Sequence, residues 1–105
     1  MTRDRIDKEM KRIGYASDIR NKHEFQSIWS GCDIKFNTKH NLPHSTIIYS
    51  KHWGKPVEVE IAGNTWLDVY KAADECIIKS GDMHHIFIED FRPTKDGKME
   101  LLTGS

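Results

Sequence analysis

The sequence has few of the residues and runs by which proteins are most readily classified. Its 105 residues include two cysteines and three prolines. Cys32 and Cys76 are far apart and have no second pair nearby, so neither a zinc ribbon nor a disulfide framework is predicted, and we interpret both as buried thiols. No apolar run approaches the roughly 20 residues that cross a bilayer, and residues 1–12 alternate charges where a signal peptide would be apolar. We therefore expect a cytoplasmic protein without a membrane segment.

The common catalytic and nucleotide-binding motifs are also missing. The chain contains no G-x-G-x-x-G, no P-loop and no G-x-S-x-G, and neither cysteine has a histidine beside it in sequence. His40 and His44 have the i,i+4 spacing of two metal ligands on a helix, but Pro43 lies between them and would break that helix. We expect no metal and no cofactor, and the sequence leaves enzymatic activity uncertain while favouring its absence.

The composition is that of an ordinary globular protein. Charged residues make up 30% and hydrophobic residues 37% of the chain, which excludes the disordered class. A chain of this length can build one hydrophobic core but not two comfortable ones. We therefore predict a single α+β domain spanning residues 1–105.

The net charge of zero conceals a strong asymmetry. Residues 1–55 carry eleven Lys/Arg and six Asp/Glu, whereas residues 56–105 carry five and ten. Such polarity can serve nucleic-acid binding, complementarity within the chain, or head-to-tail self-association. Nucleic-acid binding through the basic residues of the first helix is the least favoured of these, because no basic cluster is tight enough to follow a phosphate backbone.

Two amphipathic segments predict helices near the N-terminus. Over residues 4–13, apolar side chains recur at the spacing of one helix face. Asn21 as N-cap, with Glu24 three residues later and Gly31 as a stop, predicts a short second helix whose apolar face includes Trp29.

Alternation of apolar and polar residues then predicts three strands, over residues 33–36, 45–49 and 56–61. The best-defined helix follows, from Trp66 to Ser80, with Thr65 as N-cap, Asp68 at the third helical position and Gly81 at the end. Its spacing predicts a buried stripe that begins at Trp66 and an exposed face that includes Asp74.

Two further strands, over residues 83–91 and 98–102, flank a loop from Pro93 to Gly97 and predict a terminal hairpin. The order of elements favours an α+β fold with N-terminal helices and an antiparallel or mixed sheet of about five strands. The well-capped helix should pack on this sheet.

Three C-terminal segments resemble a known group of proteins. They are residues 64–74 (NTWLDVYKAAD), residues 82–89 (DMHHIFIE) and residues 97–105 (GKMELLTGS). They are similar to small proteins carried on bacterial integron gene cassettes. The resemblance implies an accessory bacterial protein on a mobile element, and it supplies no catalytic signature.

Histidines give one candidate for a site in the second half of the chain. His84 and His85 open the strand over residues 83–91, and neighbouring side chains of a strand point to opposite faces. His85 is expected to share a face with Phe87, Glu89 and Phe91, so the Glu89 carboxylate could orient the His85 ring. The alternative is a partly exposed histidine at the start of a strand.

A second candidate lies in the connection that contains His52 and Trp53. A tryptophan in a polar loop either contacts a ligand or partner, or folds back onto the core. Our leading hypothesis is an accessory protein that acts by self-association, as a homodimer, or by binding a protein partner. The alternative is a small-ligand-binding protein or minor enzyme with a pocket formed by His52, Trp53, His85 and Glu89.

Overall fold

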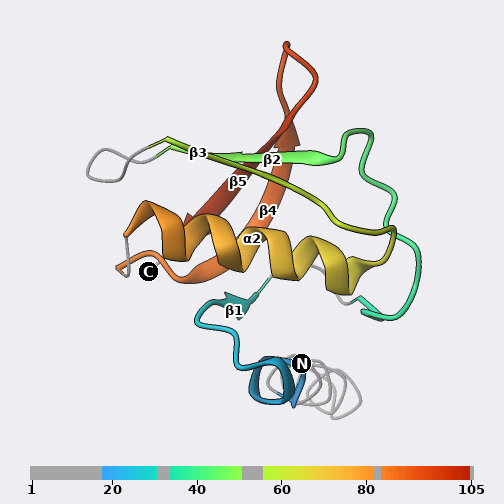
Figure 1. The fold of residues 1–105 in the computed structure, drawn as a ribbon, viewed down its shortest axis with the longest axis vertical. Coiled ribbons are helices and arrows are strands. Elements are labelled where there is room, and N and C mark those ends of the chain that lie inside the picture. The colour runs from blue at the N-terminus through green and yellow to red at the C-terminus, as the bar shows by residue number, and fades with distance from the viewer. Residues whose placement is uncertain (1–17, 31–33, 51–55, 82–83, 105) are drawn as a thin grey trace, which may run out of the picture.

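The computed structural model of the chain describes residues 18–30, 34–50, 56–81 and 84–104. They form a mixed five-stranded sheet with one long helix, α2, lying across one face (Figure 1). The elements are β1 (Ile28–Trp29), β2 (Thr46–Tyr49), β3 (Val57–Glu60), α2 (Trp66–Ser80), β4 (Phe87–Pro93) and β5 (Met99–Gly104). A helical stretch over residues 18–23 precedes β1. The predicted α+β class and mixed sheet are confirmed, whereas the helix predicted over residues 4–13 lies outside the described residues.

The strand order across the sheet is β1-β4-β5-β2-β3. The hairpins β2–β3 and β4–β5 are antiparallel, and the parallel pairs β2–β5 and β1–β4 join them to each other and to β1. The edge strand β1 pairs through only two residues, opposite Phe87 and Ile88. Beyond Ile88, β4 therefore has no described strand on that side.

Helix α2 begins and ends as its sequence predicts. The Thr65 hydroxyl accepts a hydrogen bond from the Asp68 amide at 3.3 Å, and the Asp68 carboxylate accepts one from the Thr65 amide at 3.0 Å. These bonds from Thr65 hold the pKa of Asp68 below its ordinary value, because they favour the ionised carboxyl. At the other end Gly81 has φ +78°, a left-handed conformation that glycine adopts without steric cost.

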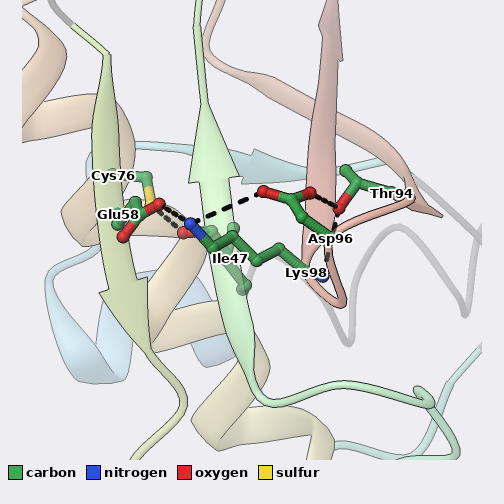
Figure 2. Close-up of polar contacts among 6 residues, drawn as sticks. All are labelled: Ile47, Glu58, Cys76, Thr94, Asp96 and Lys98. Carbon is green, nitrogen blue, oxygen red and sulfur yellow. Dashed lines mark hydrogen bonds and ion pairs between the residues drawn. The ribbon is translucent and has the colours of Figure 1, made fainter.

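The core lies between α2 and the inner face of the sheet. Cys76 on α2 is fully buried and its thiol donates to the Ile47 carbonyl at 3.8 Å (Figure 2). Burial raises the pKa of Cys76 to about 12, so this thiol is protonated and unreactive at neutral pH. The expectation of a buried thiol is confirmed for Cys76, and Cys32 lies outside the described residues.

The opposite face of the sheet carries a small charged network. Lys98, the residue before β5, extends across β2 to form an ion pair with Glu58 on β3, and its ammonium lies 3.7 Å from Asp96 (Figure 2). Thr94 in turn donates to Asp96. The Glu58 carboxylate raises the pKa of Lys98, which stays charged at neutral pH.

The helix predicted between Asn21 and Gly31 is wrong. The helical stretch ends at His23, and Glu24 has a positive φ of 57°, which turns the chain out of the helix. Ile28 and Trp29 then form β1 beside β4. Trp29 packs in the core from this edge strand, whereas Ile28 is half-buried and is not part of the core cluster.

The strand predicted over residues 33–36 is also absent from its described part. Phe36 lies in a turn, is 2% exposed, and packs in the core. Phe36 is apolar because its ring packs against Trp29 and Tyr70, while its carbonyl accepts from the Leu67 amide on α2.

A β-bulge changes the predicted faces of β4. The pairing with β5 shifts between Ile88 and Asp90, so that Ile88 is opposite Thr103 and Phe91 is opposite Leu101. Both of those β5 residues are buried, and therefore Ile88 and Phe91 face the core together. The expectation that Phe87, Glu89 and Phe91 share one face is wrong, because the extra residue reverses the alternation.

Candidate binding site: an aromatic hollow

Trp29 is the centre of a cluster of aromatic rings. Its ring centroid lies 5.2 Å from that of Phe36, 5.4 Å from Tyr70, 5.8 Å from Phe91 and 6.1 Å from Trp66. Edge-to-face and tilted contacts at such distances stabilise aromatic pairs beyond their burial. Trp29, although its strand has only two residues, therefore contacts β4, α2 and the connection before β2.

A buried polar group on α2 fixes the segment that leads into Trp29. Ser27 is fully buried; its amide and hydroxyl donate to the Asp74 carboxylate at 2.7 and 2.6 Å, and its carbonyl accepts from the Tyr70 hydroxyl at 2.7 Å. All polar groups of Ser27 are thus paired. Burial raises the pKa of Tyr70 to about 12, which keeps this hydroxyl a donor at neutral pH.

Asp74 was expected on the exposed face of the helix, and that prediction is wrong. Asp74 is only 6% exposed, because the segment over residues 25–29 covers that side of α2. Helical periodicity alone cannot identify a face that buries a carboxylate against another segment.

The connection over residues 34–42 is attached to the start of α2. Amides at a helix N-terminus have no partner within the helix, and here two of them bond to this connection. The Trp66 amide donates to the Thr38 carbonyl at 3.0 Å, and the Leu67 amide donates to the Phe36 carbonyl at 2.8 Å. The His40 amide also donates to the Asn64 carbonyl at 2.9 Å, so the connection and the helix start form one framework.

Between this framework and β4 lies a hollow of about 390 Å³, which we call the aromatic hollow. Its aromatic walls are Trp29, Trp66 and Phe91. The remaining lining residues are the apolar Ile34, Leu42 and Ile88 and the polar Asn41, Glu89 and Asp90. A volume of this size with mostly apolar walls and a few polar groups is typical of small-molecule sites.

Two acidic residues at the bulge reach the aromatic hollow in different ways. Asp90 accepts a hydrogen bond from the Phe91 amide at 2.8 Å, which holds its carboxylate at the backbone of that wall residue. The Glu89 carboxylate instead lies against β5, since a Cβ placed on Gly104 would be 2.7 Å from Oε1. Glu89 therefore lines the hollow as part of the strand, while its charged end is directed toward β5.

Comparison with known proteins finds no matching family model, no matching curated protein and no matching solved structure. The aromatic hollow is therefore interpreted from its own residues. Within the described ranges, no group of three His, Cys, Asp or Glu side chains is placed to hold a metal ion. No helix in this described part is long and apolar enough to cross a membrane.

The residues proposed from sequence are only partly brought together. Glu89 lines the aromatic hollow, whereas the half-buried His85 precedes β4 and is not among the lining residues. His52 and Trp53 lie outside the described residues. His40 accepts a hydrogen bond from the Leu42 amide at 3.2 Å and packs edge-on against Trp66, at 6.1 Å between ring centroids.

Sequence reasoning missed the aromatic walls as a site. Trp29 was assigned to a helix that does not form, Trp66 to the helix face against the sheet, and Phe91 to the face opposite Ile88. The one available signal was the number of aromatic residues, ten among 105. That signal does not say which rings meet.

Proposed function

We propose that the protein binds a small organic molecule in the aromatic hollow. The observation that carries this proposal is a preformed space of about 390 Å³ between Trp29, Trp66 and Phe91. The backbone of two of the walls is held by hydrogen bonds: that of Trp29 through β1 and the Ser27–Asp74 bonds, and that of Trp66 through its amide bond to Thr38. A site that exists before the ligand arrives loses little free energy in ordering its side chains.

Binding is favoured over catalysis by the chemistry of the lining. Among the lining residues that the structure describes there is no histidine, cysteine, serine, threonine or lysine, so the described lining supplies none of the groups that usually act as nucleophiles or bases near neutral pH. This proposal corresponds to the small-ligand alternative suggested by the sequence. Of the four residues predicted for that pocket it keeps Glu89, and its tryptophans are Trp29 and Trp66.

The fragment experiment uses the three tryptophan indole N–H signals in a proton–nitrogen NMR spectrum, assigned by single Trp→Phe variants. Small aromatic and aliphatic fragments that enter the hollow should shift the signals of Trp29 and Trp66. Phe91→Leu should weaken their binding by about three- to tenfold, because an aromatic contact contributes roughly 1 kcal/mol beyond its burial. Phe87→Leu is the matched control, since Phe87 is exposed on the other face of β4 and does not line the hollow.

The proposal fails if no fragment shifts these two signals, or if the fragments that do so bind equally well to Phe91→Leu. It also fails if Phe87→Leu weakens binding as much as Phe91→Leu. Spectra of both variants with dispersed amide signals establish that the fold is intact.

Self-association of the kind expected from the charge asymmetry is a second proposal with a weaker geometric basis. The described surface exposes only two large hydrophobic side chains, Ile78 on α2 and Phe87 on β4, whereas stable interfaces usually bury an apolar centre within about 800 Å² per partner. A homodimer built by the opposite charges of the two halves would therefore be sensitive to salt. Light scattering that gives a monomer mass at every concentration in low salt contradicts it.

An accessory role, as the resemblance to integron gene-cassette proteins implies, is compatible with either proposal, and so is the cytoplasmic location expected from the sequence. Binding a small molecule requires no catalytic signature, and that group supplies none. The assignment to such a cassette stays a prediction.

A further inference from the structure

The charged residues that line the aromatic hollow in the described structure are all acidic. Within the described part of the chain, its lining includes two carboxylate residues, Glu89 and Asp90, and no arginine, lysine or histidine. Lys35 and Lys39 lie in the connection over residues 34–42 that frames the hollow, but neither is a lining residue. The charges of the lining itself therefore favour a cation over an anion.

The aromatic walls add to this preference. The face of an aromatic ring carries partial negative charge and attracts a cation within about 6 Å of its centroid, with tryptophan the strongest. Two of the three walls are tryptophans whose centroids are 6.1 Å apart and whose planes cross at 74°. An ammonium group with apolar substituents is less strongly hydrated than a primary ammonium. It therefore loses less hydration free energy when it leaves water to contact these rings.

Asp90 is the carboxylate best placed to act as the counter-ion. One of its oxygens is fixed by the Phe91 amide, and Phe91 is itself a wall of the hollow. The Glu89 carboxylate is directed to Gly104 on β5. The two neighbouring acids thus differ in position, which provides a matched pair for a test.

The free side of β4 is poorly suited to a peptide that would add a strand there. The amide of Phe91 already bonds to Asp90, Pro93 has no amide hydrogen, and the bulge interrupts the regular spacing of backbone groups. These are features by which proteins prevent strands from adding to a sheet edge. A small molecule is therefore the better occupant.

We infer that the aromatic hollow binds organic cations, namely ammonium groups bearing methyl or larger apolar substituents, with the Trp29, Trp66 and Phe91 rings around the apolar substituents and Asp90 as counter-ion. This inference rests on the proposed function, because it specifies the class of ligand for the same hollow. It goes further in assigning one carboxylate to recognition.

The experiment compares three probes of nearly the same shape. Choline carries a positive charge, 3,3-dimethylbutan-1-ol is its neutral carbon analogue, and 3,3-dimethylbutanoate carries a negative charge. Each is titrated into the full chain at low ionic strength while the indole signals of Trp29 and Trp66 are followed by NMR. Choline should bind about tenfold more tightly than the neutral alcohol, from the combined ring and carboxylate attraction, and the carboxylate probe should bind most weakly.

The same titrations with Asp90→Asn and Glu89→Gln test the counter-ion. Asparagine retains an oxygen that can accept from the Phe91 amide, so Asp90→Asn removes the charge while keeping the local geometry. The preference for choline over the alcohol should fall about two- to fivefold in Asp90→Asn, as expected for an exposed charge, and change less in Glu89→Gln. An equal or larger fall in Glu89→Gln overturns the assignment of Asp90.

Failure of this inference is distinguishable from failure of the proposed function. If the alcohol binds as tightly as choline and both shift the indole signals, the hollow binds ligands but does not select cations, and the inference is wrong. If neither these probes nor the neutral fragments shift the signals, the proposed function itself is wrong.

Discussion

The two ends of the five-stranded sheet differ in how regular their structure is. On the β2–β3 side, regular strands carry alternating side chains beneath a helix that begins with a capping box and ends with a left-handed glycine. On the β1–β4 side, a two-residue strand, a bulge and an irregular connection meet around aromatic rings. The regular side packs tightly through repeating contacts, and the irregular side depends on a few specific ones.

This difference explains why the aromatic hollow lies where it does. A regular strand in place of the β4 bulge would point Phe91 away from Trp29, and a longer β1 would extend alongside β4 where the hollow now opens. Bulges occur often beside functional sites because they redirect side chains in this way. The hollow is therefore a consequence of incomplete strand pairing.

The largest effect should follow from breaking the polar contact that holds the irregular side. Asp74→Ala leaves the buried amide and hydroxyl of Ser27 without an acceptor, and we expect the free energy of unfolding to fall by about 3 kcal/mol. Urea denaturation followed by far-ultraviolet circular dichroism measures this change. Near-ultraviolet dichroism should weaken as well, because Trp29 loses its fixed position among the rings.

Glu75→Ala is the control for Asp74→Ala, since Glu75 is the next residue of α2 and its side chain is 50% exposed in an ion pair with Lys79. It should change the free energy of unfolding by less than about 0.5 kcal/mol. Equal effects of the two substitutions would contradict the proposed role of Asp74 in holding the irregular side.

The regular side is also the one that sequence predicts well. The Thr65 cap, the Gly81 stop and the alternation in β3 are local signals, and each one describes the backbone of its own segment. Ile28 and Trp29 show the opposite case, because their strand conformation is set by pairing with residues almost 60 positions later. The candidate site was accordingly predictable only for Glu89, and no local pattern indicated that Trp29, Trp66 and Phe91 meet.

A medium effect, confined to the regular side, should follow from removing the helix cap. Thr65→Ala should lower the free energy of unfolding by about 1 kcal/mol, because the Asp68 amide loses its acceptor. Thr65→Ser retains the hydroxyl and should recover most of that loss in urea denaturation. If Thr65→Ser is as destabilised as Thr65→Ala, the hydroxyl is not the source of the effect.

The partner carboxylate gives this cap a pH dependence. Hydrogen bonds from Thr65 lower the pKa of Asp68 in the folded state, so its stabilising contribution is present above its unfolded pKa of about 3.8 and is lost as the pH falls further through the folded value. Asp68→Asn should therefore show a smaller loss of stability than the wild type as the pH falls below about 4. A parallel pH profile for the two proteins contradicts this assignment.

The smallest effect should come from the charged network on the outer face of the sheet. Lys98→Met removes the ion pairs with Glu58 and Asp96, but the side chains of Lys98 and Glu58 are 30% and 55% exposed, so water and salt already weaken their attraction. The raised pKa of Lys98 means that its contribution is fully present below about pH 10.5 and is lost as the pH rises through the folded value, so measurements at pH 7 include all of it. Urea denaturation at low and high salt should show a slight destabilisation in Lys98→Met that shrinks with salt, and no change in Lys95→Met from the same turn. A loss as large as that in Asp74→Ala would show that the regular side, too, depends on one specific polar contact, and the contrast between the two sides would not hold.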